Sequence, residues 1–129
     1  MINERTKTIL YWVLTGFLAF GMLAQGFTQT LHLKSFVDLI VVQLGYPSYF
    51  LTIIGIWKIL GAIAILIPGF ALLKEWAYAG FFFVMSGALF SHLALRDPVR
   101  DILPSVLLLT VIVGSWYYRP IDRKITFKN

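Results

Sequence analysis

Four long runs of apolar residues, interrupted by very few charged side chains, most limit what this chain can fold into. A run of about 18 or more such residues is long enough to cross a bilayer as a helix. Apolar residues make up 59% of the chain and charged residues 13%, unlike a soluble protein. The sequence therefore predicts an all-α, membrane-embedded four-helix bundle, a single domain over residues 1–129. The predicted spans are residues 8–28, 48–67, 73–95 and 101–118.

The first apolar run has an alternative interpretation. Ala19, Phe20 and Gly21 loosely resemble the cleavage site of a secretory signal peptide. The run is longer than the apolar segment of such a peptide, so a first spanning helix is the favoured interpretation.

A fifth segment, residues 30–44, differs because its polar residues share one helical face. Its apolar side chains recur at i, i+3, i+4, i+7 and i+8, the pattern of an amphipathic helix. The other face carries His32, Lys34, Ser35 and Asp38. The segment is too short and too polar to cross a bilayer. We expect it to lie in the interface as a surface helix or, alternatively, to form a lid over an internal cavity.

The distribution of basic residues predicts the orientation of the chain in the membrane. Four spans place both termini on one side, and basic residues normally gather on the cytoplasmic side. The opposite side carries only Lys34, Arg96 and Arg100, so both termini are expected in the cytoplasm. The net charge of +5 then reflects topology and contact with anionic lipids, and does not indicate nucleic-acid binding. The basic residues on the terminal side are Arg5, Lys7, Lys74, Arg119, Arg123, Lys124 and Lys128.

The sequence offers little for enzymatic chemistry. The chain has no cysteine, and its two histidines, His32 and His92, lie too far apart for a metal-binding motif. Paired carboxylates, a nucleophile motif and a glycine-rich phosphate loop are also absent from the sequence. We therefore assign no catalytic residue and no metal ligand, and favour a non-enzymatic role.

Lys58 lies in the middle of the second apolar run, roughly 15 Å from either end at the helical rise per residue. A lysine at that depth costs about 2.5–3.5 kcal/mol on insertion scales. Gly55 and Ala62 share its helical face, and small residues let a neighbouring helix approach closely. Lys58 should therefore face the bundle interior. It is either a structural residue that binds helix carbonyls or the centre of a polar site.

Three features of the third and fourth runs carry local predictions. Gly80 and Gly87 belong to a stripe of small residues that favours close contact with another helix. Glu75 is expected to complement the dipole at the start of its helix. Asp97 followed by Pro98 is typical of a helix N-terminus, with Asp97 as the capping residue.

Helix direction predicts that several polar side chains approach Lys58. Side chains tilt toward the N-terminus of their helix, so Lys58 leans outward while Gln25 and His92 lean inward from helices of opposite direction. Gln25 as a helix–helix hydrogen bond and His92 as an interfacial residue are the structural alternatives. Counting from the helix ends places Ser86 at a similar depth, and Asp97 and Asp101 at the rim. The predicted ligand or partner pocket consists of Lys58, His92, Gln25, Ser86, Asp97 and Asp101.

Three stretches of the chain follow a recognisable order. The first joins Leu44-Gly45-Tyr46-Pro47 to Lys58-Ile59-Leu60-Gly61-Ala62. The second is Leu73-Lys74-Glu75-Trp76-Ala77-Tyr78-Ala79-Gly80-Phe81. The third contains Gly87-Ala88, Ser91-His92, Asp97-Pro98 and Pro104. In these stretches the chain resembles the DoxX-like family of small four-helix membrane proteins and, more distantly, the receptor chaperone NACHO.

The resemblance implies a four-helix bundle in a bacterial inner membrane, without a settled catalytic residue. Some relatives are linked to quinone-coupled sulfur oxidation or oxidative-stress complexes, whereas NACHO helps to assemble other membrane proteins. We therefore expect a module that binds a hydrophobic small molecule, a lipid or the transmembrane helices of a partner, as an assembly factor does. The alternative is the membrane subunit of a quinone-linked redox complex. A quinone or a lipid is the candidate cofactor, and membrane lipids, another membrane protein or a second copy are the candidate partners.

Overall fold

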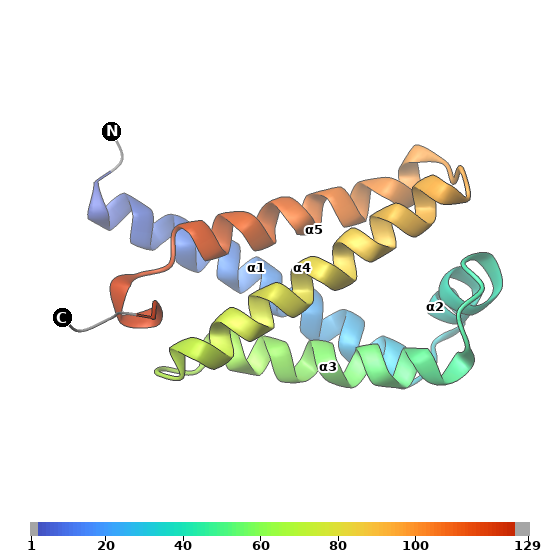
Figure 1. The fold of residues 1–129 in the computed structure, drawn as a ribbon, viewed down its shortest axis with the longest axis horizontal. Coiled ribbons are helices and arrows are strands. Elements are labelled where there is room, and N and C mark those ends of the chain that lie inside the picture. The colour runs from blue at the N-terminus through green and yellow to red at the C-terminus, as the bar shows by residue number, and fades with distance from the viewer. Residues whose placement is uncertain (1–2, 126–129) are drawn as a thin grey trace.

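Four long helices make up most of the protein in the computed structural model, which describes residues 3–125 (Figure 1). They are α1 (Glu4–Thr30), α3 (Ser48–Leu66), α4 (Ala71–Ala94) and α5 (Val99–Tyr117). Each is long and apolar enough to cross a membrane. The described residues contain no strand, so the predicted all-α bundle is confirmed. Lys128, counted above among the basic residues, lies outside the described residues.

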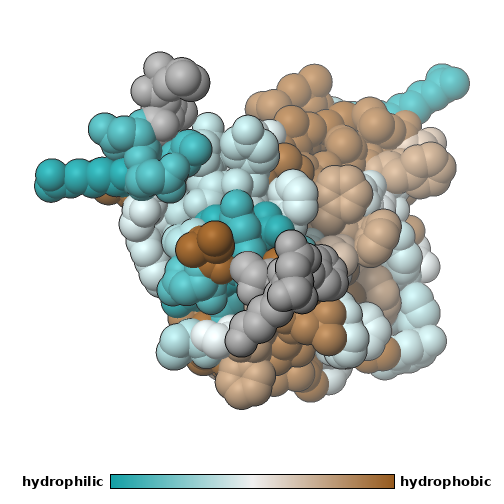
Figure 2. Space-filling view, turned by 60° about the vertical axis from the view of Figure 1, so that its left-hand side comes forward, coloured by the Kyte–Doolittle hydropathy of each residue, from teal (hydrophilic) through white to brown (hydrophobic). Residues whose placement is uncertain are grey.

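Both termini and the turn between α3 and α4 lie at one end of the bundle (Figure 1). The segment between α1 and α3 and the loop between α4 and α5 lie at the other end. Figure 2 brings the terminal end forward, and hydrophilic side chains gather there beside a largely apolar flank. Many large apolar side chains remain exposed along the helices, Phe20 and Phe83 among them, which suits a surface in contact with lipid.

Helices α1 and α3 pack backbone against backbone where Gly26 faces Gly55. A Cβ atom added to Gly26 would lie 2.7 Å from the carbonyl oxygen of Gly55, and the reverse distance is also 2.7 Å. Ala62, farther along the same face of α3, is fully buried. The predicted small face of α3 therefore allows close contact with α1, as in other membrane helix pairs.

The core of the bundle combines apolar packing with a buried hydroxyl network. Ser115 Oγ lies 2.6 Å from Thr15 Oγ1 and 2.7 Å from the Tyr78 hydroxyl, so three helices are joined by hydrogen bonds. Because these three hydroxyls bond each other, none of them is left unpaired in the hydrocarbon region. The surrounding apolar core includes Leu18, Met22, Ile65, Phe81, Met85 and Ile112.

The segment between α1 and α3 is helical over a shorter range than predicted. Helix α1 continues to Thr30, and His32 then adopts a positive φ of 55°, which interrupts an α-helix. The chain becomes helical again in α2 (Lys34–Phe36) and continues as the wider π-helical turn η1 (Val37–Gln43). Ile40 is buried, whereas Lys34 and Asp38 are exposed, so the segment is amphipathic. Its length is insufficient to cross a bilayer.

Two basic side chains bind the C-terminal carbonyl groups of α3. Lys74 Nζ donates to the carbonyl oxygens of Ala64 at 3.1 Å, of Gly69 at 2.6 Å and of Ile67. Arg123, in the 3-10 turn η2 (Ile121–Arg123), donates to Ile65 O at 2.9 Å. The last carbonyls of a helix lack partners within the helix and carry partial negative charge. Both cations therefore stabilise this helix end.

Glu75 does not play the predicted role at the start of α4. The first turn of α4 carries no acidic residue, and Glu75 lies beyond it. Its carboxylate lies 2.8 Å from Arg119 Nε and accepts a 2.9 Å hydrogen bond from Trp116 Nε1. The prediction was wrong because α4 begins at Ala71, which places Glu75 beyond the first turn, where Trp116 of α5 and the following Arg119 contact the carboxylate.

Candidate functional site

A cavity of about 480 Å³ lies in the half of the bundle away from the termini. Helices α1, α3, α4 and α5 all contribute to its wall, and the segment 34–44 covers it through Phe36, Leu39, Ile40 and Leu44. The geometry favours the lid interpretation of this segment over a simple surface helix. The cavity wall is mostly apolar but includes the polar side chains of Gln25, Gln29, Lys58, His92, Arg100 and Asp101.

Lys58 is the buried cation of this cavity. Its side chain is only 5% exposed, and Nζ donates a 2.9 Å hydrogen bond to Gln25 Oε1. The ion pairs found within residues 3–125 do not include Lys58. An ammonium group has three N–H donors. Lys58 therefore has a neutral partner, donors free for a ligand, and no acidic partner among the residues that the structure describes.

Gln29 is a cavity residue that the sequence analysis missed. It is 2% exposed, and its Oε1 has no hydrogen-bond partner within the described part of the chain. Gln29 follows Gln25 by one helical turn and therefore lies on the same face of α1. That spacing could have identified it. A buried amide without a partner is costly, and here it lines a cavity that can hold a ligand.

His92 and Asp97 form a pair at the C-terminal end of α4. His92 Nδ1 lies 2.6 Å from Asp97 Oδ2, and this hydrogen bond holds the pKa of Asp97 below its ordinary value. His92 lines the cavity, whereas Asp97 does not. Asp97 was also predicted as the cap of the next helix, but Pro98 occupies that position without a side-chain hydrogen bond. The imidazole is a closer partner for this carboxylate than the N–H groups of α5.

Polar contacts of Gln43 and of the nearby Tyr46 attach the covering segment to the helices beneath it. Gln43 Nε2 donates to Asp101 Oδ2 on α5 at 3.1 Å. The Tyr46 hydroxyl lies 2.8 Å from Ser91 Oγ on α4. Asp101 lines the cavity and joins α5 to the lid through Gln43, and within the described residues it forms no ion pair with Lys58.

Ser86 is not part of the cavity wall. Its Oγ donates to the carbonyl oxygen of Phe83 on its own helix at 3.1 Å, and its side chain is only half-buried. The count of residues from the helix end predicted its depth in the membrane but not the direction around the helix axis. The structure thus places Gln25, Lys58, His92 and Asp101 at one cavity, Asp97 behind His92, and Ser86 outside it.

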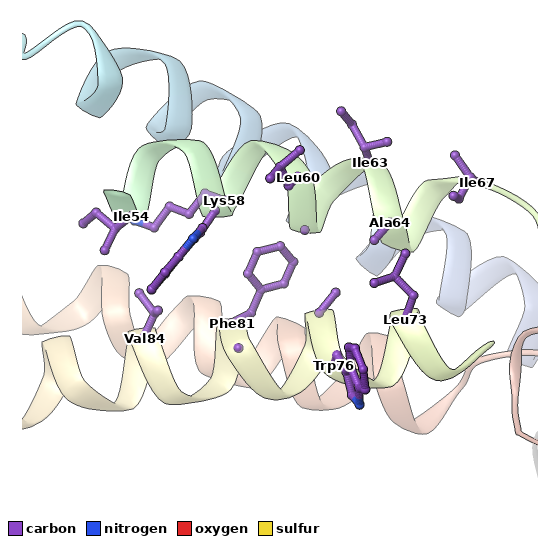
Figure 3. Close-up of a pocket in the computed structure, with 14 residues that line it drawn as sticks. Ile54, Lys58, Leu60, Ile63, Ala64, Ile67, Leu73, Trp76, Phe81 and Val84 are labelled. Atoms are coloured by element: carbon purple, nitrogen blue, oxygen red, sulfur yellow. The ribbon is translucent and has the colours of Figure 1, made fainter. Parts of the chain in front are cut away.

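A second hollow, about 800 Å³ in volume, runs along the outside of the bundle between α3 and α4 (Figure 3). Its wall is almost entirely apolar, and in Figure 3 Phe81 projects from α4 toward α3. Ile54, Lys58 and Val84 line both this groove and the internal cavity. The groove and the cavity therefore adjoin at Lys58, the one charged side chain that residues 3–125 contribute to the wall of the groove.

Gly80 and Gly87 widen these spaces and do not mediate the predicted close helix contact. A Cβ atom added at either position would meet no atom within 4 Å. Gly80 lines the groove and Gly87 lines the cavity. The described residues contain no cluster of side chains able to hold a metal ion. The arrangement suits an elongated molecule with a long apolar part and one polar end.

Comparison with known proteins supports the family resemblance. The DoxX-like family model matches residues 13–115. The chain belongs to the DoxX-like family. No curated protein and no solved structure matches it. The matched range of this DoxX-like chain runs from α1 to α5 and includes Gln25, Gln29, Lys58 and His92, so the cavity lies within the family domain.

Proposed function

We propose that this DoxX-like protein binds an amphiphilic molecule from the bilayer, with the apolar part in the α3–α4 groove and the polar end in the cavity. The observation that carries this proposal is that the groove and the cavity adjoin at Lys58. A lipid-facing groove is directly accessible to molecules dissolved in the bilayer. The internal cavity offers polar side chains that lipid tails cannot satisfy.

The identity of the bound molecule decides between two roles. A lipid or another small amphiphile fits a non-enzymatic binding module. A quinone would favour the membrane subunit of a quinone-linked redox complex, since Lys58 and His92 can donate hydrogen bonds to its carbonyl oxygens. Mass spectrometry of the protein purified in a neutral detergent distinguishes these outcomes. Retention of a partner protein's transmembrane segment instead of a small molecule would contradict the proposal and favour an assembly factor.

A bulky side chain at Gly80 should block the groove. The Gly80→Phe side chain would project into free space within the groove, so we expect the bound amphiphile to fall at least several-fold with folding retained. The amount retained per mole of purified protein is measured by mass spectrometry.

Gly16→Phe is the matched control. Gly16 is also an exposed helical glycine with no atom within 4 Å of an added Cβ, but it lines none of the cavities described above. This variant should retain the amphiphile as the wild type does. Equal retention by the Gly80→Phe and Gly16→Phe variants would show that the groove is not the binding site.

We propose an inner-membrane location with both termini in the cytoplasm, because basic residues concentrate at the terminal end. The chain lacks cysteine, so an introduced cysteine is a unique label. A membrane-impermeant maleimide should label a Val99→Cys variant in intact cells and an Asn3→Cys variant only after lysis. Labelling of the Asn3→Cys variant in intact cells would contradict this topology.

A further inference from the structure

We propose that the polar end of the bound amphiphile carries a negatively charged oxygen group, a carboxylate or a phosphate, and that the Lys58 ammonium binds it. This inference rests on the proposed function. It assigns the chemical class of the ligand's polar end, which the shape of the groove does not determine.

The surroundings of Lys58 favour an anionic partner. Its ammonium is almost fully buried, and its hydrogen-bond partner is the neutral amide oxygen of Gln25, 2.9 Å away. A buried charge normally requires an opposite charge, because removing it from water is costly and one neutral hydrogen bond compensates only part of that cost. An anionic oxygen in the cavity beside Nζ would supply the opposite charge.

The acidic groups near Lys58 are bonded to other residues. Asp101 accepts a hydrogen bond from the lid residue Gln43. Asp97 is paired with His92 and does not line the cavity. Arg100 adds a second cationic side chain to the wall. The formal charge facing the cavity is therefore positive, with Lys58 and Arg100 against Asp101, which favours an anionic occupant.

Gln29 adds a buried amide whose oxygen has no hydrogen-bond partner within the described residues. Its side chain is buried, lines the same cavity and lies one helical turn from Gln25. An amide presents a donor at one end and an acceptor at the other, and a half rotation exchanges them. Gln29 can therefore turn its NH2 group toward the anionic group and donate to it, while Lys58 neutralises the charge. The buried amide then gains the partner that it otherwise lacks.

The test compares two probes with the same hydrocarbon chain. Oleate, at a pH where the acid is ionised, and oleyl alcohol share the hydrocarbon chain, and their polar ends are a charged carboxylate and a neutral hydroxyl. We expect wild-type protein in neutral detergent to bind oleate roughly tenfold to a hundredfold more tightly, because a hydrogen bond to a charged group is worth about that factor. The Kd of each probe is measured by displacement of a fluorescent fatty-acid analogue. Equal affinities in the wild type would overturn this inference.

The same pair of probes tests whether Lys58 is the anchor. Lys58→Met should lower the affinity for oleate to that for the alcohol, whereas Lys58→Arg should keep the preference for oleate. An unchanged preference in a folded Lys58→Met variant would overturn the assignment. If that variant does not fold, the wild-type comparison and the Lys58→Arg variant still decide the question.

A third probe and a blocked groove complete the experiment. Oleoyl lysophosphatidic acid has the same chain and a phosphate, so tighter binding than oleate assigns the site to phospholipids, and weaker binding assigns it to free fatty acids. The Gly80→Phe variant should weaken all three probes. If it weakens none, the proposed function fails, whereas loss of the oleate preference alone refutes only the anionic end.

Discussion

The Gly55→Leu variant should lose the folded bundle, whereas the Gly16→Leu variant should remain folded. At Gly55 an added Cβ would lie 2.7 Å from the carbonyl oxygen of Gly26 and 2.8 Å from the backbone nitrogen of Thr30. These are backbone atoms of α1, so no rotation of a side chain can relieve the contact. Overpacking usually costs 1–3 kcal/mol and more where the structure cannot yield, so we expect the free energy of unfolding to fall by more than about 3 kcal/mol.

SDS-unfolding titrations in mixed micelles measure this difference. Both variants convert an α-helical glycine to leucine, so their helix propensities and added apolar volumes match. An added Cβ at Gly16 would meet no atom within 4 Å. Similar unfolding midpoints for the Gly55→Leu and Gly16→Leu variants would mean that α1 and α3 do not cross at Gly26 and Gly55.

The fold could be predicted because the bilayer restricts a chain of this composition to very few arrangements. Each apolar run is long enough to span, and a helix satisfies its own backbone hydrogen bonds in the absence of water. The small face of α3 could be predicted too, because Gly55 and Ala62 lie on one helical face. The helix break after Thr30 could not be predicted, because the apolar spacing across residues 30–44 fits one continuous helix. It depends on the positive φ of His32.

Only some of the residues that line the cavity could be predicted from the sequence. The opposed tilts of side chains on helices of opposite direction do bring Lys58 and Gln25 within hydrogen-bond distance. Ser86 does not line the cavity, because a residue count says nothing about which face of α4 points into the bundle. Asp97 had two plausible partners, the N-terminus of α5 and His92, and the sequence offers no means of ranking them. Gln29 could have been found from its spacing to Gln25.

The basic residues at the terminal end of the bundle show a second limit of prediction from the sequence. Lys74 and Arg123 were assigned to topology alone, because basic residues at a cytoplasmic helix end are expected there in any case. In the structure both are buried against the C-terminal carbonyls of α3. Arg123 belongs to a turn far along the chain, so only the three-dimensional packing of that turn against α3 reveals its partners. Lys74 and Arg123 were predicted to set the orientation of the chain, and their contacts show that they also stabilise the end of α3.

The Lys74→Met variant should be far less stable than the Lys7→Met variant. Lys74 is 1% exposed and binds carbonyl oxygens of Ala64, Ile67 and Gly69, whereas Lys7 is half-exposed and contacts only the exposed Glu4. Arg123 still reaches Ile67 O at 3.4 Å, and water can reach the turn at Gly69. The carbonyl of Ala64 has no such substitute, because the last carbonyls of a helix lack partners within it.

We expect the Lys74→Met substitution to lower the free energy of unfolding by about 1–3 kcal/mol, since it leaves the buried Ala64 carbonyl unsatisfied and one such acceptor costs about that much. The Lys7→Met substitution should change it by less than about 0.5 kcal/mol, as for other exposed ion pairs. Both substitutions remove one positive charge from the terminal end, so any effect of charge on topology is matched. Equal unfolding midpoints in SDS titrations would mean that the Lys74 ammonium lies in water and not against α3.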